Sequence, residues 1–221
     1  MIELDHADLN ISKQAALLYL NRTSLYYKPK ICNDTELANK IHEIYLQSKC
    51  IYGYRKISAS LPNQVWATDI TYIALPSGFV YLVAIIDIYS RYIIGHKVSV
   101  SLDAEFCQQC LNDSLKIGLK PQIFNSDQGS QFTSIEFIKI LQINHIQISM
   151  DGKGRCFDNI FVERLWRTIK QEDAYYQRYE TVTEAKKSLG EFITWYNYER
   201  LHQALDYKTP HQVYFGQATL V

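Results

Sequence analysis

Three β-rich segments follow one another between Val65 and Val100, and they constrain the fold more than any other part of the sequence. They are dense in β-branched and aromatic residues, and only the short connections "PSG" and "SR" separate them. The middle segment contains a nearly continuous apolar run, Val80 to Ile88, which is typical of a strand buried on both faces. We therefore expect antiparallel strands at residues 65–75, 78–90 and 91–100, joined by hairpins.

The apolar period becomes helical after Asp103, and helices then alternate with strands. Asp103 is a plausible helix start and Gly118 a plausible stop. The order predicts an α/β fold with a mixed five-stranded sheet flanked by helices. The expected elements are a helix from Asp103, a strand at 121–127, a helix at 134–144, a strand at 146–150, a Gly-rich loop at 151–159 and a helix at 160–172.

The two ends of the chain have a helical pattern. Residues 11–29 have apolar residues at helical spacing with a break at "NRTS", the outline of a helix-turn-helix, and residues 34–48 form another amphipathic helical segment. Residues 181–214 predict one long helix followed by a docked loop. The expected domains are a small helical region at 1–62, a core at 63–173 and a helical C-terminal segment at 174–221.

Composition excludes some classes of function. The formal net charge is zero, which argues against nucleic-acid binding through bulk charge alone but leaves room for a local basic face. Five cysteines, an odd number, and the absence of a basic leader in the first ten residues indicate a reducing intracellular compartment. No apolar run reaches the ~18 residues of a membrane span. Cys107 and Cys110 lack metal-ligand partners at suitable spacing and are expected on a buried helix face.

Three acidic residues stand out by their context. Asp69 lies inside the first strand, Asp127 ends the fourth, and Glu163 lies in the helix after the Gly-rich loop. A charge inside an apolar strand is costly unless it is paired or binds a metal, and strand ends are common ligand sites. Carboxylates that converge from separate rigid elements are suitable ligands for divalent cations.

Each acid also has a simpler interpretation. Asp69 could pair with a lysine, Asp127 could form a turn before Gly129, and Glu163 could be a solvated helix residue. Asp87 is another acid within a strand, but its neighbour Arg91 offers a simple ion pair, so it is not counted as a metal ligand. Trp66 and Trp166 are expected in the core.

Spacing favours the metal interpretation. Between Asp127 and Glu163 lie 35 residues, and Lys170 follows Glu163 by seven positions, or two helical turns. Glu163, Arg167 and Lys170 would form one stripe that is acidic and then basic. Phosphodiester chemistry needs such a combination of a metal ligand and nearby cations.

At this point the sequence resembles a known family. The acids and their spacing match the D,D(35)E signature of retroviral-type integrases, and five blocks resemble the catalytic subunit (OrfB type) of bacterial insertion-sequence transposases. The blocks extend from about Asn63 to Tyr214 and read "NQVWATDITYI", "YLVAIIDIYSRYIIG", "FNSDQGSQFTS", "ISMDGKGRCFDNIFVERLWRTIK" and "YNYERLHQALDYKTP".

The resemblance implies an RNase H-like fold and a DDE-type transposase that cleaves and joins DNA strands during transposition and DNA integration. Asp69, Asp127 and Glu163 would be both the catalytic residues and the ligands of two Mg²⁺ (or Mn²⁺) ions. Side chains that would contact DNA are Gln131, Lys153, Arg155, Arg167 and Lys170. Gly129 would make a tight bend beside Asp127, and Asn159 would cap the helix that carries Glu163.

Implied partners are the DNA of the element ends and target, further copies of the chain, and a DNA-binding subunit from an upstream reading frame, in the bacterial cytoplasm at the nucleoid. The N-terminal stretches "LNRTSLYYKPK" and "IYGYRKISASL" also resemble the family, but only Pro62 separates the second from Asn63, so the chain is expected to be internally shortened. Alternative functions are an inactive or regulatory DNA-binding remnant of a transposase and a cellular RNase H-like nuclease.

Overall fold

The computed structural model describes residues 61–150 and 160–216, together with the single positions Lys13, Asn39, His42, Glu43 and Leu46, which are helical and exposed. The chain divides into two compact units, Met1–His42 and Glu43–Val221, and every strand and helix named below belongs to the second. Apart from the single positions, the helix-turn-helix predicted within residues 1–62 lies outside the described residues. Within the described ranges, no helix combines the length and apolar character that crossing a membrane requires.

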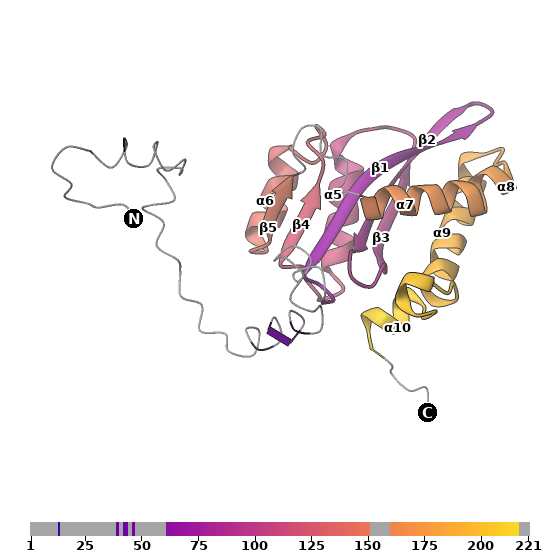
Figure 1. Ribbon diagram of the computed structural model, residues 1–221. Helices are drawn as coiled ribbons and strands as arrows, with labels where there is room; N and C mark the ends of the chain where they lie inside the picture. The colour runs from indigo at the N-terminus through magenta and orange to yellow at the C-terminus, as the bar shows by residue number, and fades with distance from the viewer. Residues whose placement is uncertain are drawn as a thin grey trace. The chain divides into compact units, whose positions relative to one another are not determined.

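A mixed five-stranded sheet forms the centre of the second unit, as predicted (Figure 1). Its order is β3-β2-β1-β4-β5, with antiparallel pairing among the first three strands and parallel pairing of β1 with β4 and of β4 with β5. The strands are β1 Val65–Leu75, β2 Gly78–Asp87, β3 Ile93–Ser99, β4 Ile123–Ser126 and β5 Gln147–Met150.

The second and third strands are shorter than predicted because a turn occupies residues 88–92. The Arg91 amide donates a hydrogen bond to the Asp87 carbonyl, and Arg91 itself has a left-handed φ of 64°. The Ser90 amide donates to Oδ1 of Asp87 at 2.8 Å. This local hydrogen bonding competes with ladder pairing and ends β2 at Asp87.

Helices cover both faces of the sheet (Figure 1). Helices α5 (Ala104–Leu115) and α6 (Ile135–Ile143) pack with side chains such as Val83 and Ile85 of β2, whereas α7 (Ile160–Ile169) and α9 (Val182–Tyr198) pack with Leu82 and Ala84. Because successive strand residues point to opposite faces, β2 contributes to both apolar clusters. This confirms the expectation of a central strand buried on both sides.

Side-chain caps fix where the helices begin. Asp103 accepts a hydrogen bond from the Phe106 amide at α5, Ser134 accepts one from Phe137 at α6, and Thr181 accepts one from Glu184 at α9. Gly118, with a φ of +89°, donates to the Leu115 carbonyl just after α5 ends, which confirms the predicted stop.

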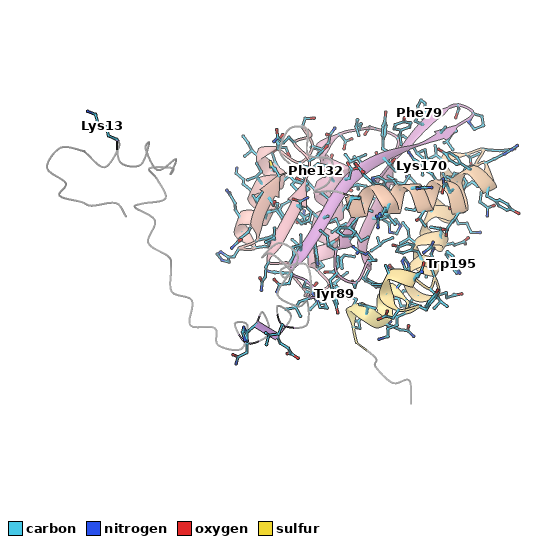
Figure 2. All side chains as sticks on the ribbon, viewed as in Figure 1. Lys13, Phe79, Tyr89, Phe132, Lys170 and Trp195 are labelled. Atoms are coloured by element: carbon cyan, nitrogen blue, oxygen red, sulfur yellow. The ribbon has the colours of Figure 1, made fainter. Side chains whose placement is uncertain are left out.

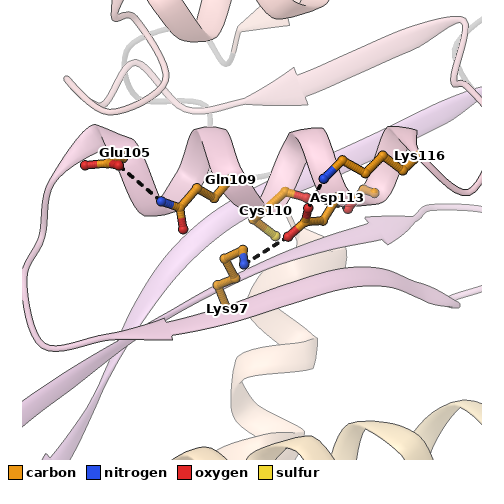
Figure 3. A network of polar contacts seen from close by, with 7 residues as sticks. Lys97, Glu105, Gln109, Cys110, Asp113 and Lys116 are labelled. Carbon is orange, nitrogen blue, oxygen red and sulfur yellow. Dashed lines mark hydrogen bonds and ion pairs between the residues drawn. The ribbon is translucent and has the colours of Figure 1, made fainter.

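Helix α5 separates a charged outer face from an apolar inner face. On the outside, Asp113 bridges Lys97 of β3 at 2.9 Å and Lys116 at 2.8 Å (Figure 3). On the inside, Cys107 and Cys110 are buried free thiols, as expected from the sequence. Burial raises the pKa of the Cys110 thiol to about 12 and also raises that of Cys107, so neither has the thiolate character of a redox or metal site.

The predicted helix at 160–172 is wrong in its last part, because α-helical geometry ends at Ile169. A π-helical segment, η1 (Lys170–Ala174), follows directly and leads into α8 (Tyr175–Gln177). The buried Asp173 accepts hydrogen bonds from the Tyr179 hydroxyl and, at 3.3 Å, from Ser188. Glu172 receives two hydrogen bonds from Arg200, at 2.6 and 2.8 Å. Side chains of η1 thus link α7 to the C-terminal segment.

The C-terminal segment ends in more structure than the predicted loop. After α9 come a short 3-10 turn, η2 (Gln203–Leu205), and a helix, α10 (Pro210–Tyr214), which starts with a capping box between Thr209 and Gln212. Tyr214 stacks on Tyr92 with ring centroids 4.8 Å apart and donates a hydrogen bond to Asn63. The tail is therefore held against the sheet by aromatic contacts, in agreement with the predicted docking.

Candidate active site

Asp69 is a charged residue in the middle of β1, and it faces α7. Its Oδ1 accepts a hydrogen bond of 2.7 Å from the Ile70 amide, and its Oδ2 accepts one of 2.9 Å from Nε1 of Trp166. The alternative interpretation from the sequence, an ion pair between Asp69 and a lysine, does not describe these contacts. The carboxylate is instead oriented by two neutral N–H donors, so its negative charge stays available to a cation.

Asp127 directly follows β4, which is parallel to β1. The parallel ladder of β1 and β4 ends with the pair Ala67 and Asn125, and each acid follows its own strand's member of that pair by two residues. Asp69 and Asp127 therefore both lie just beyond the paired stretch, at the same end of it. The sheet therefore brings together two acids that are 58 positions apart in sequence.

Glu163 is on α7, the helix that covers this face of the sheet, and its side chain is exposed. Apolar neighbours on the same helix, among them Val162, Leu165 and Trp166, are buried and anchor α7 in the core. The helix thereby carries Glu163 to the neighbourhood of Asp69.

The pKa of Asp69 is raised from its ordinary value. Burial is the main reason, and the negative charges of Asp127 and Glu163 raise this pKa further, against the lowering effect of the Trp166 and Ile70 hydrogen bonds. A buried carboxylate whose charge is opposed by two neighbouring carboxylates is suited to a cation, which would relieve the repulsion.

A tight turn follows Asp127, as the sequence predicted. Oδ1 of Asp127 accepts a hydrogen bond of 2.9 Å from the Gly129 amide, and the Gly129 carbonyl accepts from Phe132 and Thr133. A Cβ at position 129 would lie 2.9 Å from Asp127 Oδ1 and 3.3 Å from Gln131 Oε1, so only glycine fits without displacing them. The turn and the acidic site are therefore one structure, because the turn fixes the carboxylate.

A cavity of about 180 Å³ opens beside Asp69 and Asp127. Its walls are mixed, with the two carboxylates on one side and apolar or aromatic side chains around them. The lining residues are Asp69, Ile70, Thr71, Tyr72, Tyr81, Leu102, Asp127, Gln131 and Phe132.

The predicted supporting residues fall into two groups. Gln131 lines the cavity, with its amide nitrogen donating to the Leu102 carbonyl at 3.2 Å. Arg167 is exposed on α7 and donates to Gln171, and the Lys170 ammonium lies 4.8 Å from the centre of the Tyr72 ring. The predicted DNA contacts Lys153 and Arg155, and the predicted cap Asn159, lie outside the described residues.

Asp87 is excluded from the site, but not for the reason expected from the sequence. Its fully buried carboxylate accepts hydrogen bonds from the Ser90 amide and hydroxyl and from the Asn63 amide. The Arg91 guanidinium instead stacks on Phe161 at 3.6 Å, and burial lowers its pKa to about 10. Burial also raises the pKa of Asp87. The predicted Asp87–Arg91 ion pair is thus replaced by a capped turn.

The carboxylate groups of Asp69, Asp127 and Glu163 are chemically suitable ligands for divalent cations. Hard carboxylate oxygens are the usual protein ligands of Mg²⁺ and Mn²⁺, and two of the three acids line one cavity. Among residues 61–150 and 160–216, no three Asp, Glu, His or Cys side chains already converge as a cluster that could hold a metal ion. Of the three acids, Glu163 is the one on a helix, and its side chain is exposed.

Comparison with known proteins agrees with this geometry. Two models of the integrase core domain match residues 59–156 and 144–210. An uncharacterized transposase-like protein of Haemophilus influenzae is 35% identical over 158 residues, which is 71% of this chain and 73% of that protein. The chain belongs to the integrase-core transposase family.

Other members of this transposase family are longer than the matched region. The transposase of insertion sequence element IS904 from Lactococcus lactis is 37% identical over 158 residues, or 69% of this chain, and the match covers 61% of that relative. The chain thus spans about three fifths of the length of this relative.

Solved structures confirm the RNase H-like fold of the integrase core. The catalytic core domain of HTLV-2 integrase in complex with magnesium, in its dimeric form, matches 70% of this chain and 97% of that chain, with a TM-score of 0.56 and 19% identity. A simian T-cell lymphotropic virus intasome in complex with a PP2A regulatory subunit gives a TM-score of 0.63 at 17% identity over 73% of this chain and 58% of that chain.

Sequence reasoning missed the role of one residue in this integrase core. Trp166 is buried, as predicted, but it also donates the hydrogen bond that orients Asp69. The available signal was its spacing, because position 166 lies three residues after Glu163 and so on the same face of the helix. A tryptophan on the face that carries a functional acid has an indole N–H that needs a partner.

Proposed function

We propose that this chain is the catalytic subunit of a DNA transposase that cleaves DNA strands and transfers them to new sites, using divalent metal ions. One observation carries the proposal: Asp69 and Asp127 line one cavity just beyond the parallel β1–β4 pairing, and Trp166, on the helix that carries Glu163, donates a hydrogen bond to Asp69. The family supports the same reaction. Residues 63–173 would be the catalytic core, 1–62 the N-terminal DNA-binding region and 174–221 the helical segment that braces the core.

Asp69, Asp127 and Glu163 would hold two Mg²⁺ or Mn²⁺ ions. Such a pair, when bound, activates the attacking oxygen and stabilises the leaving oxygen of an in-line displacement at phosphorus. The chain's own part is to keep the ligands in place. Trp166 and the Ile70 amide orient Asp69, the Gly129 amide orients Asp127, and Glu163 would supply the third carboxylate from α7. The magnesium named for the HTLV-2 integrase core supports this cation.

The proposed substrates are the DNA ends of an insertion element and a target DNA. Lys170, Arg167 and Gln131 would contact the strand near the acids, together with Lys153 and Arg155. The active complex would contain more than one copy, since similar integrases are named as a dimeric form and an intasome. A DNA-binding subunit from an upstream frame would join it in the bacterial cytoplasm, at the nucleoid.

The test uses the purified full chain and labelled duplexes taken from the DNA that flanks its gene. We expect Mg²⁺-dependent nicking and joining to a second duplex, and we expect Asp69→Asn, Asp127→Asn and Glu163→Gln each to abolish both. Glu136→Gln, a change of an exposed helical acid on α6, is the matched control and should keep both activities.

Each other result points to a different function. Nicking without joining would indicate an RNase H-like nuclease. DNA binding with no nicking in any preparation would indicate a regulatory remnant. Nicking that persisted in one of the three variants would remove that residue from the site.

A further inference from the structure

An exposed aromatic pair lies on the β1–β2 ribbon close to the acids. Tyr72 and Phe79 are 60% and 55% exposed, and their rings meet edge to face with centroids 5.4 Å apart. Two large aromatic side chains that stay this exposed add little to stability by burial, and their ring faces are accessible to a ligand. Figure 2 labels Phe79 on the projecting part of this ribbon.

Tyr72 connects this pair to the site. It is three residues after Asp69 on β1, roughly 10 Å along the strand, and it is a wall of the cavity that Asp69 and Asp127 also line. Tyr81, which is directly opposite Tyr72 in the β1–β2 ladder, lines the cavity as well. The hollow therefore combines carboxylates on one side with aromatic and apolar surface on the other.

A cation already lies against the same ring. The Lys170 ammonium is 4.8 Å from the Tyr72 ring centre, and Lys170 follows Glu163 by two helical turns. Its positive charge thus lies against a ring that lines the same cavity as Asp69 and Asp127. The contacts with Phe79 and Lys170 also hold the ring in place, so little rotamer entropy remains to be lost when a ligand stacks on it.

These features match the parts of a nucleotide. The phosphate needs the metal-binding acids and a cation, and the base needs a flat aromatic surface. We propose that Tyr72 is a substrate-positioning residue that stacks on the unpaired base next to the scissile phosphate, while Lys170 contacts the adjoining backbone. The cavity between Tyr72, Leu102 and Phe132 receives the base. This inference rests on the proposed function, because the reacting strand presents the base.

The experiment measures base stacking without cleavage. Full chain is mixed, in Ca²⁺, with a forked DNA duplex of mixed sequence that carries 2-aminopurine as the first unpaired nucleotide, and both fluorescence and anisotropy are recorded. We expect a fluorescence change on binding by the wild type. Tyr72→Leu should lose most of that change and bind about tenfold more weakly or worse, since stacking of one base contributes about 1–3 kcal/mol.

Aromatic replacements and a distant tyrosine supply the controls. Tyr72→Phe and Tyr72→Trp should retain the signal, and the new indole should be quenched by unlabelled DNA. Tyr207→Leu, a change of a tyrosine that is also about two-thirds exposed but outside the cavity, should behave as wild type. The proposal is overturned if Tyr72→Leu binds the fork with unchanged affinity and unchanged fluorescence, or if Tyr207→Leu weakens binding equally.

The two proposals fail in different ways. Asp127→Asn should keep the stacking signal in Ca²⁺ while it loses nicking in Mg²⁺. Wild-type nicking together with an unaffected Tyr72→Leu would refute the stacking platform and leave the transposase function intact. A Tyr72-dependent fluorescence signal without nicking would support the stacking role of Tyr72 and contradict the proposed transposase activity.

Discussion

The indole Nε1 of Trp166 donates a hydrogen bond of 2.9 Å to Oδ2 of Asp69, across 97 positions of sequence. This bond joins α7 to β1 beside the cavity that Asp69 and Asp127 line. Because it favours the ionised carboxylate, it opposes the effect of burial on the pKa of Asp69. The packing of α7 and the charge of the Asp69 carboxylate therefore depend on the same contact.

Replacing Trp166 with phenylalanine should reduce activity more at low pH than at high pH. The change removes the donor and raises the pKa of Asp69, so less carboxylate is ionised in mildly acidic solution. Hydrogen bonds to charged groups contribute about 1.5–3 kcal/mol, which predicts at least a tenfold slower nicking rate there. The rate of Mg²⁺-dependent nicking as a function of pH is the measurement.

Trp66 offers the matched control for this prediction. It is also buried, and its Nε1 also donates a hydrogen bond, but to Asn63. Trp66→Phe and Trp166→Phe should lower the free energy of unfolding by similar amounts. Only Trp166→Phe should shift the acid side of the nicking rate's pH profile. Equal pH profiles for the two variants would contradict the assigned role of Trp166.

Magnesium should stabilise the fold in a way that depends on pH. The folded-state pKa of Asp69 is raised above 3.8, so its contribution to stability is present below that pH and lost as the pH rises through the raised pKa. At neutral pH the site therefore carries repulsion that a bound cation removes. We expect a larger Mg²⁺-induced increase in Tm at pH 7 than at pH 5, measured by thermal unfolding.

Asp69→Asn should remove much of this response. The neutral amide no longer repels Asp127 and Glu163, so the variant without metal should be at least as stable as the wild type at pH 7. A Tm increase with Mg²⁺ that is as large in Asp69→Asn as in the wild type would show that the cation binds elsewhere.

Asp87→Ala should destabilise the fold without a direct effect on the chemistry. The substitution leaves the Ser90 and Asn63 amides without their acceptor in a buried turn. One unsatisfied buried group costs about 1–3 kcal/mol, so the free energy of unfolding should fall by at least about 2 kcal/mol. The free energy of unfolding is measured in urea. Arg91→Ala is the control, because it should leave the hydrogen bonds of the Asp87 carboxylate in place. A loss below 1 kcal/mol would mean that the turn is held by other contacts.

Gly129→Ala should impair catalysis much more than stability. A Cβ there would meet Asp127 Oδ1 at 2.9 Å, and displacing a ligand by a fraction of an ångström is expected to slow nicking about tenfold to a hundredfold. Gly190→Ala, in the interior of α9, is the control. Its Cβ would meet only His96, at 3.9 Å, so it should stabilise the helix by about 0.5–1 kcal/mol and leave nicking unchanged. A Gly129→Ala protein with wild-type nicking would show that Asp127 tolerates the shift.

Much of the fold was predictable because its signals are local. The β-branched and aromatic residues of β1, the apolar run of β2 and the cap Asp103 all act within a few residues of sequence. The sequence also placed Asp69 within a strand and Asp127 at the end of one, where the structure has them.

Other features depend on tertiary contacts that no local pattern encodes. The Trp166 bond spans 97 positions, and the partners of Asp87 were set by a turn that includes Asn63 from before β1. The π-helical geometry at Lys170–Ala174 was not predicted either, because these residues continue the helical pattern of α7. What distinguishes them is their tertiary contacts with Tyr179, Ser188 and Arg200.

The π segment has one more consequence, which concerns rotational phase. Each residue of an α-helix turns the chain by about 100°, whereas a π turn accommodates an additional residue. Removing one residue from Lys170–Ala174 would restore regular winding but rotate the rest of that segment and α8 relative to Glu163. Arg178, with a left-handed φ of 51°, ends this helix before α9 begins, so the rotation would stop there. The buried Asp173 would then turn away from the Tyr179 hydroxyl and Ser188, while the acids stayed where they are. The segment thus sets the angle between the face of α7 that carries Glu163 and the side chains that attach this helix to the C-terminal segment.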